Sequence, residues 1–188
     1  MRNIVMAMHT SLDGFVAGTN GEMDWIKLPN GLFDFVGTLT NEADTALYGR
    51  ITWQMMDGYW PTAGDEPDAS KHDKEHAAWY NAADKIVLSR TMVAATAPKT
   101  SFIGDNTVDG IRRLKEKPGK NIHIFGSPSA SYELTRARLI DEYWLFVNPV
   151  LLGKGIPLFN DLEDRISLEL ATTKVFDKGV IALHYKLA

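Results

Sequence analysis

The stretch Asn121–Leu134, NIHIFGSPSASYEL, passes from an apolar alternating run through a Gly-Ser-Pro-Ser turn into a helical pattern. Asn121–Phe125 is typical of a strand. Pro128 suits the first position of a helix, and the Ser127 hydroxyl is expected to cap the free N–H groups of that helix. A strand that ends in glycine and turns at once into a helix N-terminus is a favourable place for an anion. We therefore expect a phosphorylated ligand at this turn.

Two earlier stretches have the same pattern of a strand followed by a small or basic turn: TALYGRITWQMM at 45–56 and KIVLSRT at 85–91. In an open parallel sheet the carboxyl ends of the strands share one edge, so we expect all three turns in one site. Arg50 and Arg90 would bring two positive charges to it. Each turn alone also fits ordinary turn geometry, a helix cap or a solvated arginine, and none is a Walker loop or a G-x-G-x-x-G motif.

The rest of the chain predicts short strands and amphipathic helices. Asn3–Met8 is typical of a central strand buried on both faces, and the Gly- and Asn-rich segment 11–31 predicts a long loop. The tail 166–188 alternates around Asp177-Lys178-Gly179, which predicts a hairpin. The other expected elements are a helix with the stripe Leu32, Phe35, Val36 and Leu39, a polar loop between Pro61 and Pro67, a helix from Ser70 to Ala83 buried through Trp79 and Ala82 or Ala83, a helix capped by Thr107, and a strand at Tyr143–Val147.

Together these elements predict an α/β fold with a mixed, mostly parallel central sheet, flanking helices and an antiparallel C-terminal hairpin. Residues 1–188 are expected to form one domain. The 20 basic and 24 acidic residues give a net charge of −4, so we expect neither nucleic acid nor a membrane as a partner. The absence of cysteine excludes disulfides and thiolate catalysis, and it is compatible with a reducing cytoplasm.

Several side chains have both a chemical and a structural interpretation. His72 and His76, at i and i+4, could share a metal, but the run SKHDKEH is also typical of a solvated helix face, and we expect no metal site. His9, at the end of the first strand, could donate a proton or simply be hydrogen-bonded. Asp13 could present an acid at the mouth of the site or bond its own loop, and Trp25 could form the wall for a flat ring.

Seven pieces of the sequence, in order, resemble one family. They are SLDGFVAG (11–18), DW (24–25), GRITW (49–53), LSRT (88–91), IFGS (124–127), LIDEYWLFVNPVLLGKGIPLF (139–159) and GVIALHY (179–185). The chain resembles the dihydrofolate reductase-like reductases, and more closely the C-terminal reductase domain of bifunctional riboflavin-biosynthesis deaminase–reductases. The resemblance covers nearly the whole chain.

The resemblance implies a dihydrofolate reductase-like fold, NADPH as cofactor, and hydride transfer to a small pterin-like or pyrimidine-like substrate. It also implies a cytoplasmic homodimer with an apolar C-terminal interface that includes Tyr143–Val147. By resemblance, the adenosine end and 2′-phosphate would be held by Gly49, Arg50, Thr52, Ser89 and Arg90, the diphosphate by Gly126, Ser127, Pro128 and Ser129, and the nicotinamide and substrate would lie near Ala7 and Gly14, with Asp13 and Trp25 as catalytic residues.

Two positions depart from the family pattern and leave the substrate open. Leu28-Pro29 is followed by Asn30 and Gly31 rather than by an acid, and the strand before the diphosphate turn ends with Phe125. We expect an NADPH-dependent oxidoreductase. One alternative is a non-catalytic nucleotide-binding or regulatory module with the same fold, and another is an interaction domain in which the strand YWLFVNPVLL pairs two copies.

Overall fold

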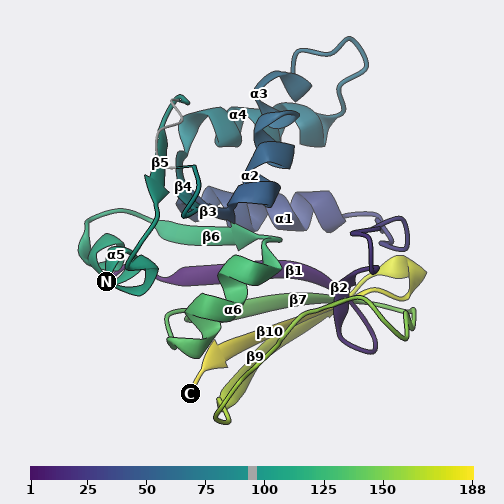
Figure 1. Ribbon diagram of the computed structural model, residues 1–188. Coiled ribbons are helices and arrows are strands. Elements are labelled where there is room, and N and C mark those ends of the chain that lie inside the picture. Colours follow the sequence, from purple (N-terminus) through teal and green to yellow (C-terminus); the bar gives the residue numbers. More distant parts are fainter. Residues whose placement is uncertain (93–96) are drawn as a thin grey trace.

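The computed structural model describes residues 1–92 and 97–188. Its main sheet has eight strands in the order β5-β4-β3-β6-β1-β7-β10-β9 (Figure 1). Within it, β1 pairs in parallel with both β6 and β7, whereas β10 pairs antiparallel with β7 and β9. The strands are β1 (Ile4–Ser11), β3 (Ala43–Gly49), β4 (Asp84–Leu88), β5 (Thr100–Ile103), β6 (Asn121–Phe125), β7 (Glu142–Asn148), β9 (Leu168–Val175) and β10 (Ile181–Leu187), and β2 (Phe15–Ala17) forms a separate antiparallel pair with β8 (Ile156–Pro157).

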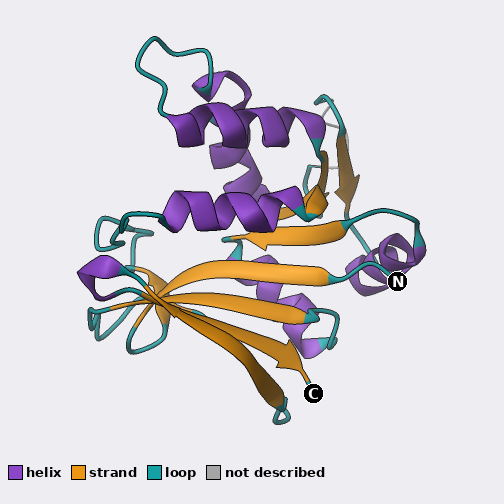
Figure 2. Ribbon diagram, turned by 180° about the vertical axis from the view of Figure 1, so that it is seen from behind, coloured by secondary structure: helices purple, strands orange, loops and turns teal. Residues whose placement is uncertain are grey.

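Helices cover both faces of the sheet (Figures 1 and 2). The helices are α1 (Leu32–Asn41), α2 (Arg50–Asp57), α3 (Trp60–Ala63), α4 (Lys71–Ala82), α5 (Thr107–Glu116) and α6 (Pro128–Arg136), and the 3-10 turn η1 (Asp177–Gly179) connects β9 to β10. Helices α5 and α6 pack on one face, and α1 and α4 on the other. No helix in the described part of the chain is long and apolar enough to cross a membrane.

The central strand β1 divides its side chains between the two layers. Ile4, Met6 and Met8 join the core under α5 and α6, whereas Val5 and Ala7 join the core under α1. A strand buried on both faces needs a continuous apolar run, which is what residues 4–8 supply. The prediction of a buried central strand is therefore confirmed, as are the mixed sheet and the C-terminal hairpin.

Four local predictions are wrong. Thr107 is the first residue of α5 rather than its cap, and its hydroxyl donates to the carbonyl of Gly104. The predicted polar loop after Pro61 begins inside the short helix α3, because proline fits the first turn of a helix. Helix α4 buries His76, Ala77 and Tyr80, so the solvated-face interpretation of its histidine run fails at His76. Of the two alanines proposed for its buried side, Ala83 is buried and Ala82 is exposed. Strand β7 is hydrogen-bonded on both sides and its ring side chains are buried, so this strand has no free edge with which to pair two copies.

Candidate functional site

The three predicted turns lie side by side because β4, β3 and β6 are adjacent and parallel. A cavity of about 780 Å³ opens at their carboxyl ends and extends to β1 and the loop 18–31. Ten of the eleven residues predicted to bind the cofactor line it: Ala7, Gly49, Arg50, Thr52, Ser89, Arg90, Gly126, Ser127, Pro128 and Ser129. The structure therefore brings together residues that lie up to 122 positions apart, from Ala7 to Ser129.

The turn before α6 has an unusual backbone. Gly126 and Ser127 both have positive φ angles, 64° and 59°. A positive φ is sterically unfavourable for a residue with a side chain, such as Ser127. The buried Ser127 hydroxyl accepts a hydrogen bond from the Gly49 amide at 2.9 Å, across to the end of β3. The prediction that Ser127 caps α6 is therefore wrong, because its left-handed backbone accompanies a hydroxyl bonded to β3 and no side-chain cap forms.

Since no side chain caps α6, its first amides stay available. The N–H groups of Ser129 and Ala130 have no hydrogen-bond partner among the described residues, as expected in a first helical turn. They lie at the positive end of the helix dipole, and both residues line the cavity. Gly49 faces the same place, since a Cβ built on it would lie 3.5 Å from the Ser129 hydroxyl and 3.8 Å from the Ser127 hydroxyl.

Two cations border the cavity where β3 and β4 end. Arg50 begins α2 and donates to Gln54 Oε1 at 3.1 Å, and Arg90 follows β4 in an exposed turn. Within residues 1–92 and 97–188, neither arginine forms an ion pair with a carboxylate. The neighbouring Ser89 hydroxyl accepts from the amides of Met92 and Thr91, so it shapes the turn that carries Arg90. Both guanidinium groups are thus free to bind an anion.

Asp13 is not among the residues that line the cavity, and neither are Gly14 and Trp25. The Asp13 carboxylate accepts from the Ser11 hydroxyl at 2.6 Å and from the amides of Gly153 at 2.7 Å and Leu152 at 3.1 Å. The Ser11 hydrogen bond, followed by that of Gly153, lowers the pKa of this carboxyl. Asp13 therefore joins two loops in this structure, while the Trp25 indole donates to the carbonyl of Glu22.

His9 does line the cavity, at the end of β1. Its ring stacks on Phe146 at a centroid distance of 5.0 Å, and its Nδ1 lies 3.3 Å from Nδ2 of Asn148. Burial lowers the pKa of His9 to about 4, so the imidazole is neutral at pH 7. Asn148 is fully buried, and it was not identified from the sequence, where only its place at the end of a predicted apolar strand could have marked it.

His72 and His76 belong to an aromatic cluster. His76 packs on Trp60 at 4.1 Å and on Trp79 at 5.2 Å, and His72 stacks on Phe33 at 4.0 Å. Burial lowers the pKa of both histidines, to about 4 for His76. Among the residues that the structure describes, no group of three or more His, Asp or Glu side chains is placed to hold a metal ion.

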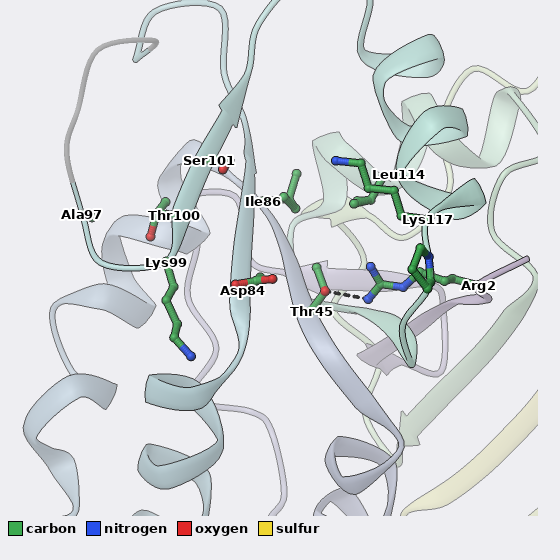
Figure 3. A pocket seen from close by; sticks show the side chains of 11 residues that line it. Arg2, Thr45, Asp84, Ile86, Ala97, Lys99, Thr100, Ser101, Leu114 and Lys117 are labelled. Carbon is green, nitrogen blue, oxygen red and sulfur yellow. Dashed lines mark hydrogen bonds between the residues drawn. The ribbon is translucent and has the colours of Figure 1, made fainter.

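A second cavity, of about 390 Å³, lies near the amino ends of β3, β4 and β5 (Figure 3). Arg2, one of the four charged residues that line it, donates to Thr45 at 2.6 Å and to the carbonyl of Lys120 at 2.6 Å, and pairs with Asp44. These bonds fix the guanidinium to its own fold. The cavity at the carboxyl ends of the strands, with its free cations and amides, is therefore the candidate functional site.

Comparisons with known proteins agree with this fold. The family model for the RibD C-terminal domain matches residues 2–182. The chain is 37% identical to the protein YyaP of Bacillus subtilis (strain 168) over 186 residues, which cover 98% of this chain and 94% of YyaP.

Solved structures are also similar. A protein of Shewanella sp. PV-4 named for riboflavin biosynthesis has a TM-score of 0.75 at 27% identity, covering 100% of this chain and 99% of that one. A Thermotoga maritima diaminohydroxyphosphoribosylaminopyrimidine deaminase/5-amino-6-(5-phosphoribosylamino)uracil reductase has a TM-score of 0.70 at 17% identity, covering 100% of this chain and 57% of that one. Dihydrofolate reductase from Enterococcus faecalis, complexed with NADP(H), has a TM-score of 0.62 at 16% identity, with 98% and 96% coverage. The dihydrofolate reductase-like fold is confirmed.

Proposed function

The chain belongs to the RibD C-terminal domain family, and on this premise we propose that it is an NADPH-dependent reductase that transfers a hydride to a small heterocyclic substrate of the pterin or pyrimidine type. The reductase activity named for the Thermotoga maritima protein and the NADP(H) named with the Enterococcus faecalis enzyme support this proposal. The proposal includes assembly as a homodimer and a location in the cytoplasm. The absence of cysteine is compatible with a reducing compartment of that kind.

The observation that carries the proposal is the fit between the cavity and a dinucleotide with an extra phosphate. The free amides of Ser129 and Ala130 suit a diphosphate, and Gly126 lets the backbone approach it closely. Arg50 and Arg90 suit the 2′-phosphate that distinguishes NADPH from NADH. From the end of β4 to the end of β1 there are three interstrand steps, which is about 14 Å at roughly 4.8 Å a step. An extended cofactor lying along this edge of the sheet would cross the ends of all four strands.

Bound NADPH would supply the hydride. The chain's own residues would bind, orient and desolvate the reactants. Ala7 and His9 lie at the β1 end of the cavity, farthest from the arginines along the sheet, and so would border the nicotinamide. The apolar side chains around them exclude water from that end: Met8, Val16, Met23, Ile26 and Ile156.

A non-catalytic nucleotide-binding or regulatory module is the second candidate, and one observation favours it: the Asp13 carboxylate is bonded to its own loops rather than presented to the cavity. Titration of the protein with NADPH, followed by tryptophan fluorescence, tests the shared premise of cofactor binding. Steady oxidation of NADPH with a panel of pterins, pyrimidines, flavins and quinones then separates the two functions. A protein that does not bind NADPH would contradict both, and one that binds but oxidises it with no compound of the panel would favour the module.

A further inference from the structure

The β1 end of the cavity is mostly apolar, and its polar side chains are His9 and Tyr132. The Tyr132 hydroxyl donates to the carbonyl of Pro157, next to Ile156. Its other walls at this end come from Met8, Val16, Ala17, Met23, Ile26 and Ile156. The charged side chains among the described lining residues are Arg50, Arg90 and Glu133, which lie on α2, after β4 and on α6. None of the three comes from β1 or from the loop 18–31. A substrate bound beside β1 therefore meets uncharged side chains from β1 and this loop, and the Tyr132 hydroxyl nearby is already bonded to Pro157.

Asn148 determines which nitrogen of the His9 ring carries the proton. The Asn148 Oδ1 accepts from the Lys27 amide at 2.8 Å, so the opposite side of the amide group must be the NH₂. That NH₂ faces three acceptors, the carbonyl of Phe146 at 3.0 Å, Nδ1 of His9 at 3.3 Å and the carbonyl of Thr10 at 3.4 Å. An amide nitrogen can only donate. The Asn148 orientation is thus fixed by four neighbours.

A proton on Nδ1 of His9 would point at this NH₂, which can only donate, so the contact at 3.3 Å requires that Nδ1 carry no proton. A neutral imidazole has its single proton on the other nitrogen, Nε2. Burial keeps the ring neutral, since it lowers the pKa to about 4. The Nε2–H has no hydrogen-bond partner among the described residues, and Nε2 is not one of the fully enclosed polar atoms. Because His9 lines the cavity, this is where the free donor is available.

We propose that His9 is a fixed neutral donor whose Nε2–H binds a carbonyl oxygen of the substrate, that Asn148 is its positioning residue, and that the substrate is an uncharged, unphosphorylated ring with that carbonyl conjugated to the reducible bond. This inference rests on the proposed reductase function and names the substrate class for it. A phosphate or carboxylate next to β1 would find no cation there among the described residues that line the cavity. A buried charge without a partner is strongly unfavourable.

The role of His9 in the reaction follows from the same geometry. When the acceptor carbon receives a hydride, the π electron pair of the conjugated system moves to the carbonyl oxygen. The Nε2–H hydrogen bond stabilises the negative charge that develops on this oxygen, as a preorganised donor in an apolar site does. His9 keeps its proton, and a proton from water completes the reduction. The two electrons come from NADPH, which becomes NADP⁺.

The first test requires no activity. Long-range ¹H–¹⁵N spectra of the ¹⁵N-labelled protein at pH 7 report the tautomer of each of its five histidines, and the His9 signals are those that disappear in His9→Gln. We expect the Nε2–H tautomer for His9, unchanged between pH 7 and pH 5. A proton on Nδ1, or a doubly protonated ring at pH 6, would overturn the proposal.

Matched variants test the donor. His9→Phe keeps a ring that can stack on Phe146 but removes the donor, and His9→Gln keeps a donor without the ring. The probe is lumazine, a neutral pteridine dione, and its binding is followed by fluorescence. One neutral hydrogen bond corresponds to about a fivefold change in affinity. We expect His9→Phe to lower the affinity for lumazine by about this factor, and the affinity of His9→Gln to stay within about twofold of wild type. Folic acid, which is anionic, should bind the wild type more weakly than lumazine does.

NADPH titrations of the same proteins separate this inference from the proposed function. Unchanged NADPH affinity in both variants, with loss of lumazine affinity in His9→Phe alone, would support the role of His9. Equal lumazine affinity in wild type and His9→Phe would overturn that role and leave NADPH binding standing. A wild-type protein that fails to bind NADPH would overturn the reductase function, whatever the His9 tautomer.

Asn148→Asp tests the positioning residue. A carboxylate can still accept from the Lys27 amide, but toward His9 it can only accept, so it should move the imidazole proton to Nδ1. We expect the reversed tautomer and a lumazine affinity as low as that of His9→Phe. A folded variant, by thermal unfolding, that keeps Nε2–H would overturn the role of Asn148.

Discussion

Replacing Arg50 or Arg90 with alanine should reduce the preference of the protein for NADPH over NADH. Both guanidinium groups border the cavity, and neither has a carboxylate partner in the described part of the chain. Hydrogen bonds to charged groups contribute about 1.5–3 kcal/mol. Because both side chains are exposed and therefore screened by solvent, we take the lower end, which corresponds to about a tenfold loss of NADPH affinity for each variant.

NADH lacks the 2′-phosphate, so its affinity should change little. Parallel fluorescence titrations with the two cofactors measure the ratio directly. Arg112→Ala is the matched control, since Arg112 is paired with Asp109 on α5 and does not line the cavity. Salt provides a further check, because added NaCl should weaken NADPH binding more than NADH binding.

Stability gives an independent readout for Arg50. This residue is the first of α2, where a positive charge opposes the helix dipole. Arg50→Ala should therefore leave the melting temperature unchanged or raise it slightly while NADPH affinity falls. Equal losses of NADPH and NADH in both arginine variants would refute the reasoning, and a fall in melting temperature would mean that Arg50 is structural.

Three further predictions concern the proposed diphosphate site at Gly49 and α6, the stability of the protein in acid, and its assembly. Gly49→Ala should leave the melting temperature unchanged, because Gly49 has φ −77° and the new methyl group fits. It should lower NADPH affinity by about tenfold or more, because the methyl group fills space beside α6. Unchanged NADPH affinity would contradict a diphosphate site between Gly49 and α6. Burial lowers the pKa of His123 to about 4, so the stability present above pH 6.5 should be lost as the pH falls toward 4, since the unfolded chain binds more protons. His123→Leu should reduce this dependence between pH 7 and pH 5 in urea unfolding, with the part due to His9 and His76 remaining. It should also add roughly 1–3 kcal/mol, because it removes a buried Nδ1 that has no partner among the described residues; an unaltered pH dependence would rule this out. Light scattering should return twice 21.0 kDa for the wild type, and Val175→Glu, at a side chain 74% exposed on β9, should return 21.0 kDa; a wild-type mass of 21.0 kDa would disprove the dimer.

The sheet and the place of the site could be predicted because both depend on local patterns. Strand-glycine-helix segments are short, and parallel strands bring their ends to one edge whatever lies between them. Gly49 and Gly126 were therefore identified as neighbours from the sequence, and the structure places both at the cavity. The short helix α3 is also predictable, since Pro61 in its first turn is a helix signal.

The details of the site could not be predicted because they depend on contacts between distant parts of the chain. The left-handed backbone of Ser127 accompanies a hydrogen bond to Gly49, 78 residues earlier. Asp13 bonds the amides of Leu152 and Gly153, and Asn148 bonds that of Lys27. Serine, aspartate and asparagine occur in many loops, and nothing local distinguishes those that bind another loop from those that bind a ligand.

The position of β1 in the sheet has a consequence for synthesis of the chain. β1 leaves the ribosome well before β6 and β7, which are its two partners in the sheet. About 110 residues separate β1 from β6, and their translation takes roughly 5–20 s at about 5–20 residues per second. During this interval the apolar run Ile4–Met8 has neither edge paired, and exposed strands of this kind aggregate. The nascent chain should therefore bind chaperones through its first strand, and the candidate site, which needs β1, β3, β4 and β6 together, should form only late in translation.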